Sequence, residues 1–409
     1  MGKIITDSNK IKEVLDDRKI DKVYPSKLAL EKSLKSDKRL IIYHGIDPTG
    51  PQLHLGHSTN YFILRKLQKL GHKVILLIGD FTAMVGDPTG KSATRKSLTK
   101  EQVIKNAKGY KKQLSKILDF NSKENPIEVK FNSSWLDKLT FKELAELSTN
   151  FTVQQMIIRD MFQERIKDNK PVSLREFLYP IMQGYDSVAM NVDMEIGGVD
   201  QTFNMLVGRD LVKIYKNKEK FVLTTKLLIN SKTNKKIMNK SEGSLVALDD
   251  SPKEMYGKIM ALPDEVILTC FELCTDLSSE EIQEIKSCIK TGENPRNIKA
   301  RLASEIVSIY HDKKTANEAE KEFNKIFKEG KKPTNIPKIK FNEGITSTST
   351  ILVETGLAPS RSAADRLIEQ GAVDTEIDGV VTNKYREKKI MPKKGMIIRV
   401  GKRKFIKLI

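Results

Sequence analysis

Two histidines three residues apart are the first residues whose types and spacing could do chemistry. They lie in D-P-T-G-P-Q-L-H-L-G-H, residues 47–57, between a predicted strand and a predicted helix. At a helix start, free backbone N–H groups and the helix dipole favour an anion, and side chains three apart share a face. His54 and His57 could therefore donate hydrogen bonds to phosphate oxygens, above all to charge that develops in a transition state. Gly56 leaves the backbone open to a flat base or sugar.

Two other interpretations of the histidine pair remain open. Neighbouring histidines can bind a metal ion, although no carboxylate or cysteine shares their local helical spacing. The two side chains could also be a satisfied structural pair. The segment alone therefore does not decide between these roles.

A second glycine-rich segment is V-G-D-P-T-G-K-S, residues 85–92. A Walker loop has a glycine five residues before its Gly-Lys pair, and that position is Val85 here. The segment therefore argues against a P-loop kinase or NTPase. Asp87 is better interpreted as a carboxylate that faces a ligand amine, with a turn-capping aspartate as the alternative.

A third segment is K-K-I-M-N-K-S-E-G-S, residues 235–244. Its Lys, Ser and Gly residues are typical of a mobile loop that closes on phosphates, with Lys240 delivering the charge. Lysine-rich loops are usually only solvated surface. The interpretation depends on the combination with the two histidines.

Polar side chains recur along the otherwise apolar stretch F-L-Y-P-I-M-Q-G-Y-D-S, residues 177–187. The i, i+4, i+7 spacing places Tyr179, Gln183 and Asp186 on one helix face. Alone, Tyr179 would be interpreted as a packing aromatic and Asp186 as a surface charge. Their shared face favours a polar pocket instead.

The elements that must position these residues alternate between strands and helices, which predicts parallel βαβ units in an α/β fold. Short apolar runs predict strands at 39–43, 73–79 and 194–198. Helical spacing predicts helices at about 56–70, 100–118, 141–191 with a break at 170–171, from about 200, and within 251–328. A Lys-, Pro- and Gly-rich linker follows, and then a small unit of about 70 residues.

Composition narrows the function classes. The chain has 409 residues and a net charge of +19, which favours a polyanionic partner such as nucleic acid or a phosphorylated ligand. The longest strongly apolar run, Val74 to Ile78, is too short to span a bilayer, so no membrane partner is expected. Cys270, Cys274 and Cys288 lack CxxC spacing and are predicted to be buried, reduced thiols of a cytoplasmic protein.

Together the segments resemble a known family. H-L-G-H is similar to the H-I-G-H signature of class I aminoacyl-tRNA synthetases, and I-M-N-K-S, residues 237–241, is similar to their K-M-S-K-S loop. Y-H-G-I-D-P-T-G-P-Q-L-H-L-G-H, V-G-D-P-T-G-K, F-L-Y-P-I-M-Q-G-Y-D-S and I-G-G-V-D-Q-T-F-N-M-L-V-G-R-D-L resemble bacterial tyrosyl-tRNA synthetases. The resemblance runs from about residue 30 to the C-terminus. It implies a Rossmann-like catalytic domain that activates L-tyrosine with ATP and transfers it to the 3′ end of tRNA(Tyr).

The loop departs from the family pattern. Ile237 replaces the first Lys of K-M-S-K-S and Asn239 replaces the central Ser, whereas Lys240 retains the second Lys. Lys235 or Lys236 could supply the missing charge.

The resemblance also implies residue roles. Tyr43 and Asp186 would hold the phenol hydroxyl, and Tyr179, Gln183 and Asp87 the ammonium. Catalysis is expected from Thr49, His54, His57 and Lys240. Tyrosine binding is expected from Tyr43, Asp87, Tyr179, Gln183, Asp186 and Gln201. ATP binding is expected from Asp47, His54, Gly56, His57, Gly198, Asp200 and Lys240. Mg²⁺ would arrive with ATP, no protein-bound metal is expected, and the resemblance implies a homodimer.

The same resemblance divides the chain. It implies a catalytic domain at 1–230 with an inserted helical tyrosine-pocket and dimer region, a loop and α-helical tRNA-binding domain at 231–330, a linker at 331–345, and an α+β S4-like RNA-binding domain at 346–409. S-R-S-A-A-D-R-L-I-E-Q-G-A-V, residues 360–373, is similar to the helical core of S4 domains. Residues 384–409 carry eleven Lys or Arg against one acid, which is an electrostatic footprint for phosphates.

Two rival functions remain. A tryptophanyl-tRNA synthetase is disfavoured by the pairing of Tyr43 with Asp186. An RNA-binding or regulatory relative without activity is supported only by the altered loop.

Overall fold

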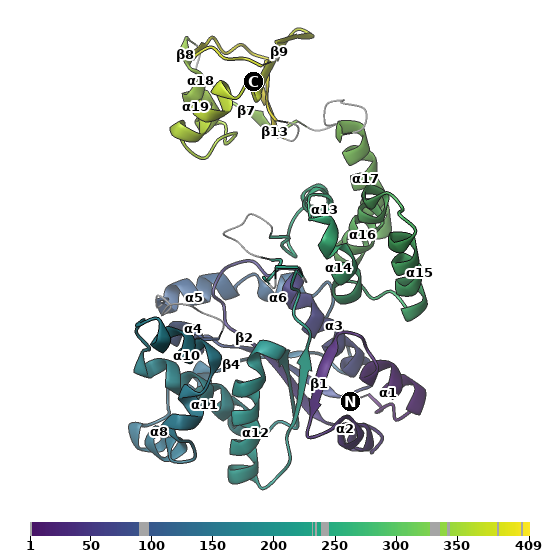
Figure 1. Ribbon diagram of the computed structural model, residues 1–409, viewed down its shortest axis with the longest axis vertical. Helices are drawn as coiled ribbons and strands as arrows, with labels where there is room; N and C mark the ends of the chain where they lie inside the picture. The colour runs from purple at the N-terminus through teal and green to yellow at the C-terminus, as the bar shows by residue number, and fades with distance from the viewer. Residues whose placement is uncertain are drawn as a thin grey trace. The chain divides into compact units, whose positions relative to one another are not determined.

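The computed structural model describes residues 2–89, 98–230, 232–233, 235–238, 245–327, 336–341, 344–382, 384–401 and 404–409. The chain divides into two compact units, Met1–Ala316 and Asn317–Ile409. Each unit has its own sheet, as Figure 1 shows, and its own set of buried apolar side chains.

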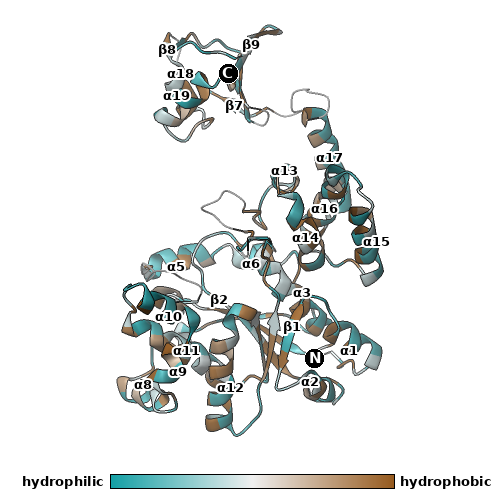
Figure 2. Cartoon of the chain, viewed as in Figure 1, coloured by the Kyte–Doolittle hydropathy of each residue, from teal (hydrophilic) through white to brown (hydrophobic). Residues whose placement is uncertain are grey.

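A six-stranded sheet organises the first unit, in the order β1-β6-β5-β2-β3-β4. All neighbouring strands are parallel except β1, which pairs antiparallel with β6. The central strands are rich in buried Ile, Leu and Val, and Figure 2 shows brown, hydrophobic stretches in this sheet. The strands are β1 (Ile20–Tyr24), β2 (Ile41–Ile46), β3 (Lys73–Ile78), β4 (Glu128–Phe131), β5 (Met194–Gly198) and β6 (Phe221–Thr225).

The strand order reverses between β2 and β5. From β2 the chain crosses through α3 (Leu55–Lys69) to β3, and from β5 it crosses through α12 (Thr202–Lys216) to β6 in the opposite direction. Because parallel crossovers are right-handed, opposite directions place α3 and α12 on opposite faces of the sheet (Figure 1). A ligand crevice is expected outside the carboxyl ends of strands at such a switch point. The predicted Rossmann-like α/β fold is confirmed.

Several predicted boundaries shift. The strand expected at 39–43 runs from Ile41 to Ile46 because β2 pairs with β3 over this whole length. The helix expected at 100–118 is interrupted at Gly109, which lies between α5 and α6. The helix near 200 begins with the 3₁₀ turn η1, and the break expected at 170–171 lies between α10 and α11. The helices of this part are α1 (Ser8–Leu15), α2 (Lys27–Leu34), α4 (Thr82–Val85), α5 (Lys100–Ala107), α6 (Tyr110–Leu114), α7 (Ser133–Leu136), α8 (Phe141–Ser148), α9 (Val153–Ile157), α10 (Asp160–Lys167), α11 (Leu174–Ala189) and η1 (Val199–Gln201).

Helices α11 and α12 approach each other closely at two glycines. A Cβ on Gly184 would lie 2.9 Å from side-chain atoms of Leu211 and Val207. A Cβ on Gly208 would lie 2.9 Å from Ser187 Oγ and 3.3 Å from Gly184 Cα, both on α11. Both positions therefore require glycine for this packing.

A helical region follows the sheet in the first unit. Arg18, before β1, donates to carbonyl oxygens of Glu272 at 2.9 Å and Leu277 at 2.7 Å, which ties the N-terminal segment to this region. Cys270 and Cys274 are buried free thiols as predicted, but Cys288 is half-exposed because α15 buries mainly its Ile282 and Ile285 positions. The helices are α13 (Pro252–Met260), η3 (Asp264–Val266), α14 (Ile267–Cys274), α15 (Ser279–Lys290), α16 (Pro295–Tyr310) and α17 (Lys313–Phe327), which runs past the end of this unit.

The second unit is a small α+β structure. Its five-stranded sheet has the order β10-β9-β12-β13-β7, and α18 and α19 pack with it around one core of apolar side chains. Near the C-terminus, β12 and β13 pair in antiparallel orientation. Residues 338–339, within the expected linker, pair with β13 as strand β7. The elements are β7 (Lys338–Ile339), β8 (Thr346–Ser347), α18 (Thr348–Glu354), α19 (Arg361–Glu369), β9 (Val373–Ile377), β10 (Val380–Thr382), β11 (Lys389–Ile390), β12 (Ile397–Val400) and β13 (Lys404–Leu408).

Candidate active site

Polar side chains gather where β2 and β3 end. Asp47, directly after β2, accepts hydrogen bonds from the Tyr179 hydroxyl at 2.8 Å and from Thr82 Oγ1 at 2.7 Å. Gly79, directly after β3, makes this approach possible, since a Cβ there would lie 2.0 Å from Asp47 Oδ1. Asp47, expected on the ATP side, is thus linked to Tyr179, expected on the tyrosine side.

The two histidines stand together at the start of α3. His54 is the N-cap, and its Nδ1 accepts from the Gly56 N–H at 3.2 Å. Nδ1 of His57 accepts from the His54 N–H at 3.2 Å, and the ring centroids lie 3.9 Å apart. Because a backbone donor occupies Nδ1 in each ring, a neutral ring carries its hydrogen on Nε2. Burial, and next the neighbouring His54, holds the pKa of His57 well below its usual range, so His57 is a neutral Nε2–H donor at pH 7.

The Asp186 carboxylate is buried. Its Oδ1 accepts from Trp135 Nε1 at 2.7 Å and its Oδ2 from Asn132 Nδ2 at 3.3 Å. Burial raises the pKa of Asp186 well above its usual range, against the effect of these two donors. Tyr43 is buried close by. Its hydroxyl is 2.9 Å from Ser187 Oγ, and Trp135 packs against its hydrophobic cluster.

Each residue expected to hold an ammonium group is hydrogen-bonded to a residue outside that set, and in the described part of the chain none is hydrogen-bonded to another member of it. Gln183 donates to Glu195 Oε1 at 3.0 Å, and Gln201 donates to Asp87 Oδ2 at 2.8 Å. Burial, followed by the charge of Asp47 and then that of Asp87, raises the pKa of Tyr179 well above its usual range. Asp87 and Tyr179 are therefore within electrostatic reach of each other. The structure joins Gln183 to Glu195, to which the sequence pattern assigns no role.

The residues expected to bind ATP include one member of an ion pair. Asp200 Oδ2 lies 2.8 Å from Nζ of Lys236. A Cβ on Gly198 would lie 2.6 Å from Asp200 Oδ1, so glycine lets the carboxylate fold back over the strand end. Thr49 is exposed in the turn after β2, where its N–H donates to the Asp47 carbonyl at 2.8 Å. Lys240, the expected loop cation, lies outside the described residues.

Sequence interpretation missed several residues of this site. Asn132 and Trp135 follow β4, so their position after a parallel strand was an available signal. Arg159 had no such signal. Its Nη2 donates to Thr89 Oγ1 at 3.0 Å, and burial lowers its pKa to about 10, with the charge of Asp87 opposing.

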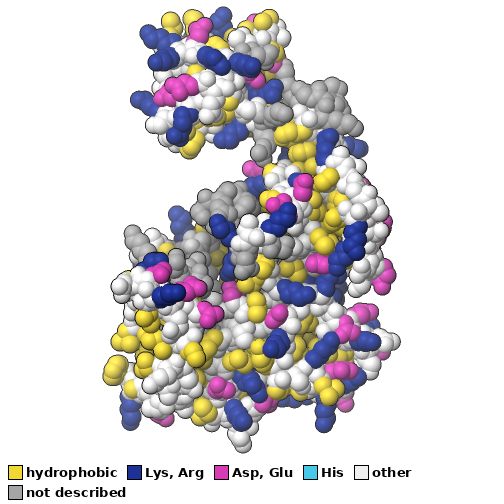
Figure 3. All heavy atoms as spheres, viewed as in Figure 1, with side chains coloured by type: hydrophobic (Ala, Val, Ile, Leu, Met, Phe, Trp, Pro, Cys, Tyr) yellow, Lys and Arg dark blue, Asp and Glu magenta, His cyan; other side chains and the backbone are white. Residues whose placement is uncertain are grey.

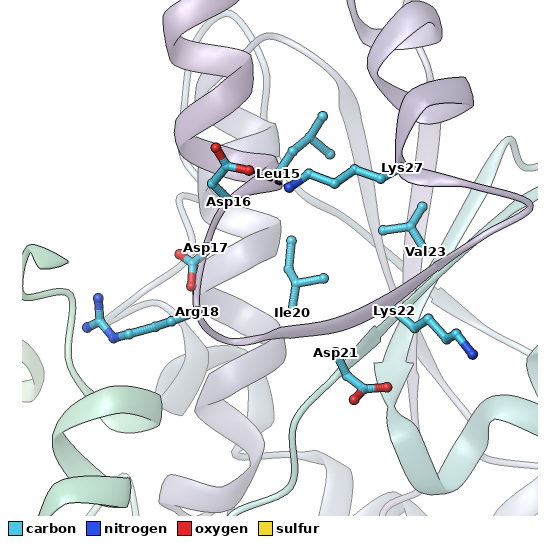
Figure 4. Close-up of a pocket in the computed structure, with 9 residues that line it drawn as sticks. All are labelled: Leu15, Asp16, Asp17, Arg18, Ile20, Asp21, Lys22, Val23 and Lys27. Carbon is cyan, nitrogen blue, oxygen red and sulfur yellow. Dashed lines mark hydrogen bonds and ion pairs between the residues drawn. The ribbon is translucent and has the colours of Figure 1, made fainter.

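A pocket of about 490 Å³ lies elsewhere, between α1, β1 and α2 (Figure 4). Its lining includes Asp16, Asp21, Lys22 and Lys27 but none of the site residues above. In the described part of the chain, no three His, Cys, Asp or Glu side chains form a group that could hold a metal ion. None of the helices that the structure describes is long and apolar enough to cross a membrane.

The fold and the site define the class of the protein: a Rossmann-like α/β protein with polar side chains at the switch point of a parallel sheet. Residues 35–328 match the family described as tRNA synthetases class I (W and Y). The chain is 45% identical to the tyrosine–tRNA ligase of Moorella thermoacetica, over 93% of this chain and 90% of that one. It is 43% identical to the tyrosine–tRNA ligase of Photobacterium profundum, over 96% of each chain. The chain therefore belongs to the class I tRNA synthetases of the W and Y group.

Solved structures agree with this assignment. A C-terminally truncated mitochondrial tyrosyl-tRNA synthetase of Aspergillus nidulans superposes with a TM-score of 0.65 at 25% identity, covering 78% of this chain and 94% of that one. A tyrosyl-tRNA synthetase of Archaeoglobus fulgidus, solved with L-tyrosine, has a TM-score of 0.59 at 17% identity, covering 77% of this chain and 99% of that one. The latter likeness concerns the fold alone.

Proposed function

We propose that the protein is a tyrosine–tRNA ligase. It uses ATP, brought with Mg²⁺, to convert L-tyrosine to tyrosyl-adenylate, and it then transfers tyrosine to the 3′ end of tRNA(Tyr). The observation that carries the choice of amino acid is the buried Asp186 carboxylate, oriented by Trp135 and Asn132 and adjacent in the chain to Ser187, which contacts Tyr43. A phenol hydroxyl needs both an acceptor and a donor when it is buried. In this proposal Asp186 is the acceptor and the Tyr43 hydroxyl is the donor.

The first step is attack of a tyrosine carboxylate oxygen on the α-phosphorus of ATP. A P–O bond forms to tyrosine, and the bond to pyrophosphate breaks. The pentacovalent transition state gains negative charge on its oxygens, and the Nε2–H groups of His54 and His57 are positioned donors for that charge. With its lowered pKa, His57 remains neutral and needs no proton exchange during the step.

Positioning accounts for the rest of the catalysis. On the tyrosine side, Gln201 is hydrogen-bonded to Asp87, Gln183 to Glu195, and Tyr179 to Asp47. The strand ends expected to meet ATP carry Asp47, Gly198 and Asp200. In this proposal Thr49 and Lys240 contact the phosphates. No residue serves as a covalent nucleophile.

We also propose that the second unit binds tRNA. Its sequence resembles an S4 domain, and its basic residues suit a phosphate backbone. Under this proposal, residues 1–230 catalyse, residues 231–330 supply the loop and a helical tRNA surface, and residues 346–409 bind RNA. The free thiols of the first unit and the proposed substrates of the protein favour a cytoplasmic location.

A homodimer is proposed from exposed apolar side chains on α8–α12. Phe141 is 88% exposed, Leu174 77% and Ile158 70%, and Figure 3 shows hydrophobic side chains gathered over this part of the first unit. An apolar surface of this kind usually marks an interface. Light scattering of Phe141→Asp should show a shift toward monomer. Retention of an unchanged dimer would remove this face from the interface.

The test of the function is ATP–pyrophosphate exchange with tyrosine, tryptophan and phenylalanine, followed by charging of tRNA(Tyr). Exchange that depends on tyrosine and charging of tRNA(Tyr) are expected. Exchange with tryptophan alone would support a tryptophanyl enzyme. No exchange with any amino acid, but binding of RNA, would support the regulatory rival.

A further inference from the structure

A fully buried lysine lies behind the proposed tyrosine pocket. Lys220, the residue before β6, forms an ion pair with Glu195 of β5, and the two side chains are 0% and 2% exposed. Its Nζ also donates to Ser187 Oγ at 2.7 Å and to the Met205 carbonyl at 3.2 Å. An ammonium group has three N–H donors and no acceptor, so these three partners use all of them.

The bond from Lys220 decides what Ser187 can do. Because Lys220 can only donate, Ser187 Oγ must accept from it, and the single hydrogen of Ser187 is left for another partner. Two acceptors are near: Tyr43 Oη at 2.9 Å and Glu195 Oε2 at 3.5 Å. The shorter distance favours Tyr43, and Glu195 Oε2 is already engaged by Lys220.

Tyr43 then has its own hydrogen to donate, and Glu195 is close enough to compete for it with a ligand. If its hydroxyl accepts from Ser187, its O–H can donate to a bound ligand. Burial, and next the charge of Glu195, raises the pKa of Tyr43 well above its usual range, so this hydroxyl keeps its proton.

Glu195 connects both ends of the proposed tyrosine site. Its Oε2 pairs with Lys220, and its Oε1 accepts from Gln183 at 3.0 Å. Gly208 makes room for the ammonium, since a Cβ there would lie 2.6 Å from Lys220 Nζ and 2.9 Å from Ser187 Oγ. A buried ion pair contributes little net stability compared with packed apolar side chains, so stability alone does not account for one at this position.

We propose that Lys220, held by Glu195 and acting through Ser187, is a positioning residue that turns the Tyr43 hydroxyl into a donor aimed at the phenol oxygen of tyrosine. This inference rests on the proposed function. The chain of donors runs from Lys220 to Ser187 to Tyr43 to substrate, and the charge at its start polarises each bond. Phenylalanine offers no acceptor for the last donor, so the network favours tyrosine over phenylalanine.

Three variants of the full-length protein test the proposal. Ser187→Ala breaks the relay and keeps the ion pair, Lys220→Met removes the charge, and Lys220→Met/Glu195→Gln removes it without leaving an unpaired carboxylate. The matched control is Lys19→Met/Asp17→Asn, which removes a second buried lysine–carboxylate pair, 1% and 2% exposed, with no hydrogen bond to α11 among the described residues. Each protein is assayed for exchange with tyrosine and with phenylalanine over a range of amino-acid and ATP concentrations.

The expected result is a rise in the KM for tyrosine and a fall in tyrosine-over-phenylalanine preference of about tenfold, the factor that corresponds to one buried hydrogen bond. Activity with phenylalanine and the KM for ATP should stay near wild type. General loosening of the structure would instead lower activity with both amino acids, and the control should leave the preference unchanged.

The proposal is overturned if Ser187→Ala, which removes a single oxygen atom, keeps the wild-type preference while its thermal transition is also wild type. It is equally overturned if the double variant folds and keeps that preference. Loss of both activities together in Ser187→Ala would also contradict it, since the residue would then be structural. Wild-type protein that shows no exchange with tyrosine would instead refute the proposed function itself.

Discussion

Trp135 donates its indole Nε1–H to Oδ1 of Asp186 over 2.7 Å, although the two residues are 51 positions apart in the chain. Asn132 reaches the other carboxylate oxygen at 3.3 Å. Each carboxylate oxygen has two lone-pair sites, so one donor on each leaves capacity for a ligand hydroxyl. The two donors thus fix the orientation of Asp186 without exhausting it as an acceptor.

Asp186→Asn should weaken tyrosine binding and the preference for tyrosine over phenylalanine, with little effect on ATP recognition. The amide loses a charged acceptor in a buried site, which typically costs about 1.5–3 kcal/mol. The measurement is the dissociation constant of tyrosine and the KM values for tyrosine, phenylalanine and ATP in the exchange assay.

Trp135→Phe is the matched variant, because it removes the donor to Asp186 and keeps a smaller aromatic ring in the same place. Trp135→Phe should also weaken tyrosine binding and the preference for tyrosine over phenylalanine, but by a smaller factor than Asp186→Asn. If Asp186→Asn leaves both tyrosine affinity and the preference at wild-type values, this carboxylate does not hold the phenol hydroxyl.

The stability of the fold should decrease in mild acid because of His72. This side chain is buried between α3 and β3, accepts the Leu40 N–H at 3.3 Å, and has a pKa lowered to about 4 by burial. Below about pH 6.5 the unfolded chain binds a proton on this residue that the folded chain does not. The free energy of unfolding should therefore fall as the pH drops from about 6.5 to 4, by up to about 3 kcal/mol.

His72→Gln should make that dependence shallower. Chemical denaturation at a series of pH values measures the slope of the free energy of unfolding against pH. This slope does not depend on any constant change in stability that the substitution causes. Equal slopes for wild type and variant between these pH values would show that His72 is not the group responsible.

The sequence was sufficient for the fold class because its signals are local. The apolar run at β3 and the Gly and Pro turns after β2 mark βαβ units without any knowledge of tertiary contacts. Helix α11 is a further case, since its regular spacing alone predicts that Tyr179, Gln183 and Asp186 share one face.

Contacts between distant segments could not be predicted in the same way. Lys220 looks like one of many surface lysines in the sequence, and only the approach of β5, α11 and α12 buries it beside Glu195. The pairing of Trp135 with Asp186 and that of Lys236 with Asp200 likewise depend on tertiary geometry. The expectation of a buried Cys288 was wrong because this residue lies in the last turn of α15, after the buried Ile282 and Ile285, where the helix is partly or fully exposed.

A chain that ends at residue 335 should form tyrosyl-adenylate normally but charge tRNA poorly. The first unit contains every described site residue, whereas the basic unit that resembles an S4 domain would be absent. Exchange and charging assays at several salt concentrations measure the two steps. The charging defect should grow with salt, because the remaining contacts to tRNA are weakened as counterions compete. Normal charging by the shortened chain across the salt series would exclude an RNA role for the second unit.

The last prediction concerns the lysines around the altered loop. Lys240→Ala should mainly slow adenylate formation, by about 2–4 kcal/mol in transition-state stabilisation, and should leave tyrosine affinity nearly unchanged, because the charge would meet phosphates only when the loop closes. Lys236 already lies beside the site. Its Nζ pairs with Asp200, and its charge is one of the influences that lower the pKa of His57.

If Lys236 supplies the charge that Ile237 removed, Lys236→Ala should slow the same step, whereas the adjacent Lys235→Ala should cost much less and serves as the matched control. Stopped-flow measurement of adenylate formation decides among the three variants. Equal effects of Lys235→Ala and Lys236→Ala would show that Lys236 has not taken over this role. A Lys240→Ala protein as fast as wild type would show that the segment is not a working signature loop and would favour the non-catalytic rival.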